Sequence, residues 1–253
     1  MSAPSDKYEH DVAENINGAI KGLVAERPRV STSYPDVRVE YGSFTGSKAV
    51  WVEVKMNHTD NLMNPRFSYI NGAWEAGASY KSPATDKLDV IFNKSKEAQD
   101  WITGLKKFLV ANDFKGDIRH LTLYSTTTER KSDKNTVSLD LMKKYLKTLP
   151  NKNICKISSI NVGELATLHY LKGKAAVAYY VSAGDDFYQF GRANPLKIPK
   201  VPVFAGTNDV VFRIGDRSSN FEIMAEVKLK HIANSPYSVK PGTSKPNPFK
   251  AIK

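Results

Sequence analysis

The chain has 253 residues, of which 41% are hydrophobic and 10% aromatic, so it can bury a substantial core and is not globally disordered. It carries 37 Lys and Arg against 26 Asp and Glu, and the formal net charge of +11 favours a polyanionic partner, nucleic acid before membrane. The single cysteine, Cys155, excludes an intrachain disulfide and a cysteine-based zinc site and fits a reducing environment.

Targeting segments and common enzyme motifs are absent from the sequence. The first seven residues have no apolar segment typical of a signal peptide, and no stretch reaches transmembrane length. We therefore expect a soluble, intracellular (cytoplasmic) protein with no membrane partner. A Walker phosphate loop, a His-Glu-x-x-His motif and a Gly-x-Ser-x-Gly motif are all missing, which argues against motor ATPases, zinc proteases and serine hydrolases.

The first expected element is a helix over about residues 7–26, ended by Pro28. One apolar stripe at helical spacing defines it: Val12, Ile16, Ile20 and Leu23. Glu9 lies on the same stripe and so points inward near the start of the helix. A buried acid is costly unless it is paired or liganded. Glu9 is therefore either a functional ligand or a residue that stabilises the helix N-terminus.

Asp36 stands at the head of a predicted strand, and Glu53 and Lys55 follow on the next one. Valines alternate with other residues over 50–55, which is the period of a strand, so Glu53 and Lys55 project from one face. If residues 42–47 form the turn of a hairpin, Asp36 comes close to Glu53. Two carboxylates and an ammonium group on one sheet face suit a hard divalent cation with a bound water.

The region after this hairpin continues an α/β pattern. His58 lies just past the strand and is either an acid–base or phosphate-contacting group or a structural residue. Residues 61–93 show few periodic signals besides an Asn-Gly turn, and their mixed aromatic and basic residues suit either nucleic-acid contacts or a small hydrophobic cluster. Helices are predicted over 95–112 and 137–149, with a strand over 117–125 between them. The order helix, strand, strand, strand, helix, strand predicts an α/β domain with a mixed sheet.

The second half begins with a predicted helix over 163–171 and a strand over 175–182. A second hairpin, over about 209–230, repeats the earlier spacing, with Glu226-x-Lys228 seventeen residues after Asp209 and ten after Asp216. This repeat is either a duplication of the first hairpin or a chance similarity between two hairpins.

We divide the chain into three predicted parts. Residues 1–150 form the α/β core, residues 151–234 form an α+β extension with the second hairpin, and residues 235–253 form a loosely packed, basic, proline-rich tail. Too few residues follow the second hairpin to close a second core. This favours the first hairpin as the functional one.

The order Glu9, then Pro35-Asp36, then Glu53-Val54-Lys55 resembles the PD-(D/E)XK nuclease superfamily, to which restriction endonucleases, phage junction endonucleases and archaeal-type Holliday-junction resolvases belong. The similarity covers about residues 7–125. It implies a restriction-endonuclease-like αβββαβ core with a mixed sheet, to which this chain adds a mainly β C-terminal portion. One departure is the short space between Pro28 and Pro35 for the first core strand.

The resemblance also implies roles for individual residues. Asp36, Glu53 and the main-chain carbonyl of Val54 would ligate Mg²⁺, for which Mn²⁺ can substitute, and Glu9 would hold a second metal ion or its waters. Lys55 would orient the attacking water. The implied activity is metal-dependent endonucleolytic hydrolysis of DNA phosphodiester bonds.

Two alternatives to this reading stay open. The chain could be a non-catalytic DNA-binding or structural protein with a decayed nuclease core, or a nuclease whose site lies at Asp209 or Asp216 with Glu226 and Lys228. A homodimer would suit cleavage of both strands, although no dimer motif is visible.

Overall fold

The computed structural model describes residues 3–28, 34–42, 49–123, 134–217, 220–230 and 234–252. The chain divides into two compact units. Unit 1 comprises Met1–Asp60, Asn161–Thr207 and Leu229–Lys253, and unit 2 comprises Asn61–Ile160 and Asn208–Lys228. Among the described residues, no helix combines the length and the apolar character needed to cross a membrane.

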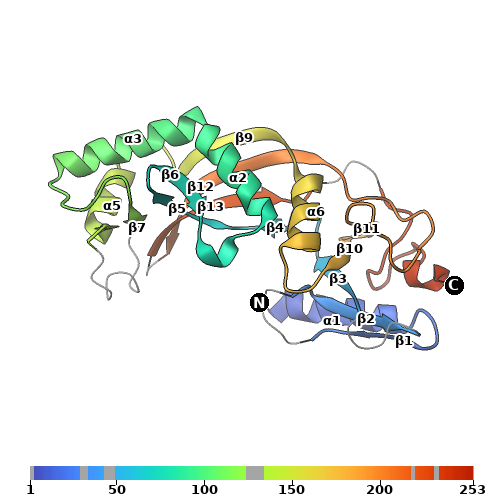
Figure 1. The fold of residues 1–253 in the computed structure, drawn as a ribbon. Helices are drawn as coiled ribbons and strands as arrows, with labels where there is room; N and C mark the ends of the chain where they lie inside the picture. The colour runs from blue at the N-terminus through green and yellow to red at the C-terminus, as the bar shows by residue number, and fades with distance from the viewer. Residues whose placement is uncertain are drawn as a thin grey trace. The chain divides into compact units, whose positions relative to one another are not determined.

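Unit 1 is built on a five-stranded sheet with the order β1-β2-β3-β10-β11 (Figure 1). Its strands are β1 (Leu23–Glu26), β2 (Val37–Tyr41), β3 (Val50–Lys55), β10 (Ala178–Ala183) and β11 (Asp186–Gln189). The pair β3–β10 is parallel, whereas the other neighbours are antiparallel. Helix α1 (Ala3–Asn17) precedes β1, and helix α6 (Val162–Lys172) precedes β10. The predicted α/β class with a mixed sheet is therefore confirmed.

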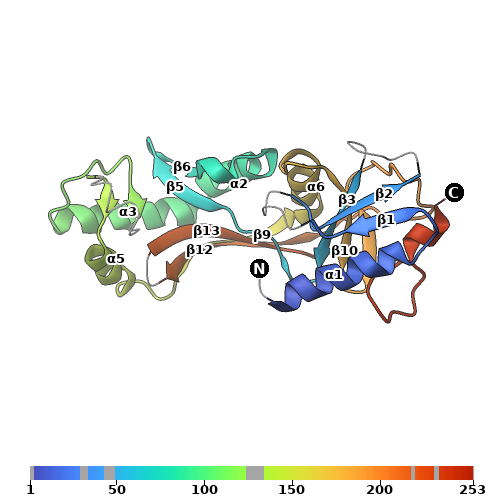
Figure 2. The same cartoon turned by 90° about the horizontal axis from the view of Figure 1, so that it is seen from below.

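Alternation along the strands separates the two faces of this sheet. Val52 and Val54 pack in one hydrophobic cluster with Val12 and Ile16 of α1, which lies against that face (Figure 2). The residues between them point the other way, and Glu53 meets Tyr170 of α6 there. The sheet of unit 1 thus has an apolar face that packs against α1 and an opposite face with charged residues near α6.

The predicted helix over 7–26 is wrong in its second half. Helix α1 ends at Asn17, whose side chain exchanges two hydrogen bonds with the backbone of Ala25, at 2.7 and 2.5 Å. Gly22 then adopts a positive φ of 83°, which a helix does not allow. Leu23–Glu26 instead form β1, so the first core strand precedes Pro28. The space between Pro28 and Pro35, where the resemblance implies the first core strand, lies mostly outside the described residues.

The tail after residue 235 is also different from the prediction. Val239 and Phe249 are fully buried and belong to the hydrophobic cluster of unit 1. Phe249 lies in the short 3₁₀ helix η3 (Pro248–Ala251) and packs edge-to-face on Phe187. Asn15 of α1 donates a hydrogen bond to the carbonyl of Val239. The tail is part of the core, not a loose basic extension.

Unit 2 contains a second sheet with the order β6-β5-β13-β12-β9, and β4 also pairs with β13. The strands are β4 (Asn61–Met63), β5 (Arg66–Ile70), β6 (Ala73–Ala76), β9 (Asn153–Asn161), β12 (Thr207–Arg217) and β13 (Asn220–Lys228). Its helices are α2 (Pro83–Lys94), α3 (Lys96–Ala111) and α5 (Leu139–Leu146), with the 3₁₀ helix η2 (Ala78–Tyr80) before α2. A two-stranded parallel sheet of β7 (Thr122–Leu123) and β8 (Thr136–Val137) completes the unit.

Several predicted elements of unit 2 are confirmed and others are shorter or new. Asn71 and Gly72, both at positive φ, make the turn between β5 and β6, and α3 agrees with the helix predicted over 95–112. Helix α2 was not predicted, although Ser82 and Thr85 form a capping box at its start. The strand expected over 117–125 is reduced to β7 in the described part.

The predicted domain boundaries are wrong. Residues 1–150 do not form one core, because 61–160 belong to unit 2 together with the hairpin of β12 and β13. The sheet of unit 1 is completed by β10 and β11, which come from the second half of the chain, as does helix α6. Unit 2 therefore interrupts unit 1 twice along the sequence.

The two-faced sheet of unit 1 predicts the effect of trimming its valines. Val52→Ala removes two methyl groups at a fully buried site, and we expect a loss of about 2–3 kcal/mol in the free energy of unfolding, measured by urea denaturation. Val24→Ala on β1, where the residue is 55% exposed, is the control and should cost under about 0.5 kcal/mol. Equal losses for the two variants would contradict the assignment of the buried face.

Candidate functional site

The register of β2 against β3 brings Asp36 and Glu53 together. Val37 lies opposite Val52 and Val39 opposite Val50, so one step further along the ladder places Asp36 opposite Glu53. The two carboxylates thus share one face of neighbouring strands, the face that α6 covers. The backbone N–H of Val54 donates to Asp36 Oδ2 at 2.8 Å, which ties the aspartate to β3 although it stands just before β2.

Glu53 is an acid buried almost completely, with 3% of its surface exposed. Its Oε1 lies 2.7 Å from Lys55 Nζ and accepts a hydrogen bond from Tyr170 Oη at 3.0 Å. Its other oxygen, Oε2, is buried and has no hydrogen-bond partner in the described part of the chain. A buried carboxylate oxygen without a protein donor is suited to act as a ligand of a cation.

The charges around Glu53 keep the pair ionised. Burial alone would raise the pKa of Glu53, but Lys55 and Lys174 outweigh this effect and hold that pKa below its usual value. Burial would lower the pKa of Lys55, but the negative charge of Glu53 raises that pKa well above normal. Glu53 and Lys55 therefore form a charged pair at neutral pH.

Asp36 behaves in the opposite way. Burial, followed by the nearby negative charge of Glu53, raises the pKa of Asp36 to about 8. Lys55 and the hydrogen bond from Val54 favour the charged form but do not compensate. Without a cation, Asp36 is therefore mostly protonated at pH 7, because two carboxylates this close cannot both ionise cheaply.

Glu9 is placed near this pair but does not join it. It is 6% exposed, and its carboxylate is bound by Arg27 Nε at 2.5 Å, while Arg27 Nη2 reaches Asp6 at 2.6 Å. Across the described ranges, no group of three or more His, Cys, Asp or Glu side chains is close enough to hold a metal ion. The structure thus brings together Asp36, Glu53 and Lys55, and it accounts for the buried Glu9 by an ion pair.

Helix α6 and the turn just after it supply residues that the sequence did not point to. Tyr170 is fully buried, and its pKa is raised well above normal by burial and by the charge of Glu53. Lys174 lies over the Tyr170 ring, 5.6 Å from its centroid. Beside them, burial and then Lys174 lower the pKa of His169 to about 4, so this imidazole is neutral at pH 7. No local pattern marks these residues, because Tyr170 and Glu53 are 117 positions apart.

His58 is engaged elsewhere in unit 1. Its Nε2 lies 3.3 Å from Asp186 Oδ2, and Asp186 also receives Lys245 Nζ and the backbone N–H of Ser235, each at 2.7 Å. Asp186 is 3% exposed, so these contacts hold a buried carboxylate and anchor the C-terminal segment. They support the structural reading of His58.

The second hairpin does not reproduce the first. Asp209 pairs with Lys156 Nζ at 2.7 Å, and Glu226 pairs with Arg213 at 2.5 Å on the strand surface. Asp216 pairs with Lys152, and Lys228 is exposed. Lys156 lowers the pKa of Asp209, the opposite of the shift at Asp36. In the described residues of this hairpin, no buried pair of carboxylates forms.

Comparisons with known proteins do not extend this picture: no protein family, curated protein or solved structure matches the chain. The residues present fit a divalent cation held by Asp36 and Glu53, because Oε2 of Glu53 lacks a donor and Lys55 balances the charge. Backbone or water oxygens would have to supply the remaining ligands.

The raised pKa of Asp36 predicts a pH-dependent effect of its replacement. The folded protein holds this proton more tightly than the unfolded chain, so its contribution to stability is present at pH 4 and is lost as the pH rises through about 8. Asp36→Asn keeps an acceptor for Val54 and carries no charge. We expect it to exceed the wild type by about 1–3 kcal/mol at pH 9 and to match it at pH 5, in urea denaturation.

A matched control is Glu26→Gln on β1, where the side chain is 53% exposed. Its effect should stay within about 0.5 kcal/mol at both pH values. An advantage of Asp36→Asn that is equal at pH 5 and pH 9 would contradict the assigned protonation of Asp36.

Proposed function

We propose that this chain is a metal-dependent DNA endonuclease and that Asp36, Glu53 and Lys55 of unit 1 carry the hydrolysis. The observation that supports this most strongly is the buried Glu53 carboxylate, with one oxygen on Lys55 and the other without a donor, opposite Asp36. A purely structural ion pair would not need a second carboxylate beside it, since that carboxylate must take up a proton to be tolerated.

The topology of unit 1 supports the resemblance to the PD-(D/E)XK superfamily. Its elements follow the order α1, β1, β2, β3, then α6 and β10, which is the αβββαβ order that the resemblance implies. The sheet is mixed, with β3 parallel to β10. In this proposal unit 2 consists of two insertions into a restriction-endonuclease-like core: residues 61–160 lie between the third strand and the second helix, and residues 208–228 follow β11.

The chain's own residues would divide the work as follows. Asp36 and Glu53 would hold Mg²⁺, or Mn²⁺ in its place, and Asp36 gives up its proton when it does so. The bound cation would stabilise charge on the phosphate and on the departing 3′ oxygen. Lys55, held 2.7 Å from Glu53, would orient the attacking water and offset the phosphate charge. Tyr170 donates a hydrogen bond to the same oxygen of Glu53 and helps to fix the carboxylate.

DNA is the partner that the charge supports. The net charge of +11 favours a polyanion in general, and a phosphodiester is the substrate that a paired carboxylate site with a lysine suits. A homodimer would place two such sites for cleavage of both strands. In this proposal Glu9 positions α1 through Arg27 and is not a ligand.

A cleavage assay with matched variants tests the proposal. The purified chain is incubated with Mg²⁺ and labelled duplex, single-stranded and branched DNA. We expect Asp36→Asn and Glu53→Gln each to lower the cleavage rate by about 10²-fold or more and to keep DNA binding. Glu226→Gln, which changes the equivalent glutamate of the second hairpin, is the control and should cut normally.

Two results would contradict the proposal. Loss of cleavage in Glu226→Gln but not in Glu53→Gln would move the site to the second hairpin. Binding of DNA by the wild type with no cleavage of any of the three substrates, in Mg²⁺ or Mn²⁺, would make the chain a non-catalytic DNA-binding protein.

A further inference from the structure

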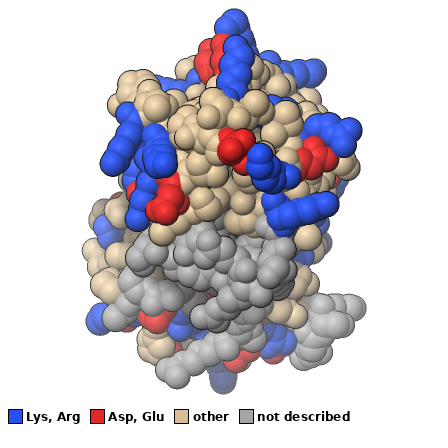
Figure 3. Space-filling view, turned by 90° about the vertical axis from the view of Figure 1, so that its left-hand side faces the viewer, with Lys and Arg blue, Asp and Glu red and all other residues tan. Residues whose placement is uncertain are grey.

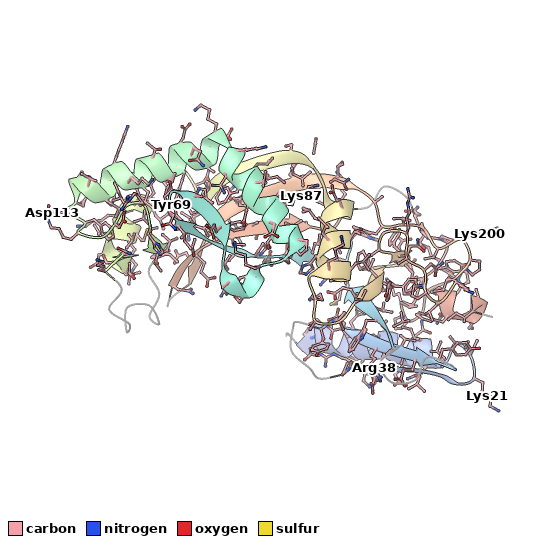
Figure 4. The ribbon with its side chains drawn as sticks, viewed as in Figure 1. Lys21, Arg38, Tyr69, Lys87, Asp113 and Lys200 are labelled. Atoms are coloured by element: carbon pink, nitrogen blue, oxygen red, sulfur yellow. The ribbon has the colours of Figure 1, made fainter. Side chains whose placement is uncertain are left out.

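Unit 2 contains a pocket of about 180 Å³ that the proposed hydrolysis does not use. It lies between strands β5, β13 and β7 and helix α3, all within this unit. Tyr69 of β5, which lines it, is labelled in Figure 4 beneath α3. An apolar cavity of about 150 Å³ accommodates benzene, so this pocket has room for one planar ring system and not for a whole nucleotide.

Flat aromatic side chains form much of its wall. Phe67, Tyr69, Trp74 and Phe221 line the pocket, and each is at most 5% exposed. Their rings are locked by their neighbours: Tyr69 meets Trp74 edge-to-face at 5.0 Å, and Phe67 meets Phe92 at 5.4 Å. Lys106 of α3 donates to Tyr69 Oη at 2.8 Å, which holds that ring from the far end. Such rigid walls favour a flat ligand that packs on ring faces and edges.

Two polar side chains in the lining of the pocket, Asn220 and Glu222, offer hydrogen-bond acceptors. Glu222 accepts from Asn220 Nδ2 at 2.7 Å and pairs with Arg66 Nε at 2.9 Å, with its side chain only 10% exposed. Asn220 Oδ1 is buried without a hydrogen-bond partner among the described residues, and the same holds for the indole N–H of Trp74. Unused acceptor capacity on an amide and a carboxylate calls for a ligand that donates N–H groups.

We propose that this pocket binds a single unstacked nucleobase that carries an exocyclic amino group, supplied by the DNA substrate. The aromatic walls would pack on the ring, and Asn220 and Glu222 would accept from its amino group. This proposal rests on the proposed function in one respect, which is that DNA is the partner. It adds that unit 2 recognises unpaired bases, which makes single-stranded or distorted DNA the preferred substrate.

The surface of unit 2 carries lysines that suit contacts with DNA phosphates. Four lysines on α3 and at the end of α5 are exposed: Lys107, Lys143, Lys144 and Lys147. Lys and Arg side chains gather in several groups on the face seen in Figure 3. Phosphate contacts of this kind carry no base preference, so the pocket would supply the selectivity that the lysines cannot.

The test uses the full chain in EDTA, where no cleavage is needed, and fluorescein-labelled single-stranded oligonucleotides of thymine with one central residue changed. In the first pair that residue carries guanine or hypoxanthine, which is guanine without the amino group. In the second pair it carries cytosine or uracil. An oligonucleotide with an abasic site at the same position gives the baseline affinity. We expect the amino-bearing member of at least one pair to bind about tenfold more tightly in fluorescence anisotropy. Glu222→Gln should reduce this preference at least fivefold.

Glu226→Gln is the matched control, because both glutamates lie on β13 and both pair with an arginine, yet only Glu222 lines the pocket. Thermal melts show whether each variant folds. If Glu222→Gln does not fold, Asn220→Ala tests the same prediction. Equal binding of both members in both pairs, or a preference that neither pocket variant changes, would overturn the proposal. Binding of free guanosine or cytidine without any preference in oligonucleotides would overturn DNA as the source.

The outcomes separate this inference from the proposed function. If the chain shows the base preference but never cleaves DNA, the proposed base-binding pocket is supported and the proposed nuclease activity is contradicted. If the chain cleaves DNA through Glu53 but shows no base preference, the proposed nuclease activity is supported and the proposed base-binding pocket is contradicted.

Discussion

Glu53 keeps a charged carboxylate inside unit 1, and the surrounding structure is arranged to offset the cost of that burial. Removing a carboxylate from water costs several kcal/mol unless close charges and hydrogen bonds replace the solvent. Lys55 and Tyr170 supply these at 2.7 and 3.0 Å, but both act on the same oxygen. The other oxygen has no donor among the described residues, and Asp36, which the strand register places opposite Glu53, is mostly protonated at pH 7. In the proposed site, a cation bound between the two acids would take the place of that proton.

The need for close charges and hydrogen bonds around the buried Glu53 explains why unit 1 is assembled from distant parts of the chain. The hairpin of β2 and β3 positions Asp36, Glu53 and Lys55 but leaves their face open to solvent. Helix α6 covers that face and brings Tyr170, while β10 extends the sheet in parallel to β3. Residues 61–160 and 208–228 form unit 2, which has its own aromatic core, in which Phe92 stacks on Phe212 at 4.0 Å. The site therefore depends on the association of residues 1–60 with residues 161–207 within unit 1.

The local parts of this picture could be predicted from the sequence, and the long-range parts could not. Period-two alternation of valines and the spacing to Asp36 correctly predicted that Glu53 and Lys55 share a face near that acid. Gly18 and Gly22 were the overlooked sign that the first helix ends early and β1 begins. The helix at 95–112 was predicted correctly but assigned to the wrong sheet, because a strong periodic pattern says nothing about its packing partner. Tyr170 was missed for the same reason, since its partner is 117 residues away.

The central claim is that Asp36 and Glu53 hold one divalent cation between them, and proton release on binding tests it most directly. Titration calorimetry with Mg²⁺ or Mn²⁺ at pH 7, in buffers of different ionisation enthalpy, counts the protons released when no DNA is present. We expect about one proton per cation in the wild type, fewer as the pH rises past about 8, and none in Asp36→Asn. Absence of cation binding, or an unchanged proton count in Asp36→Asn, would contradict it.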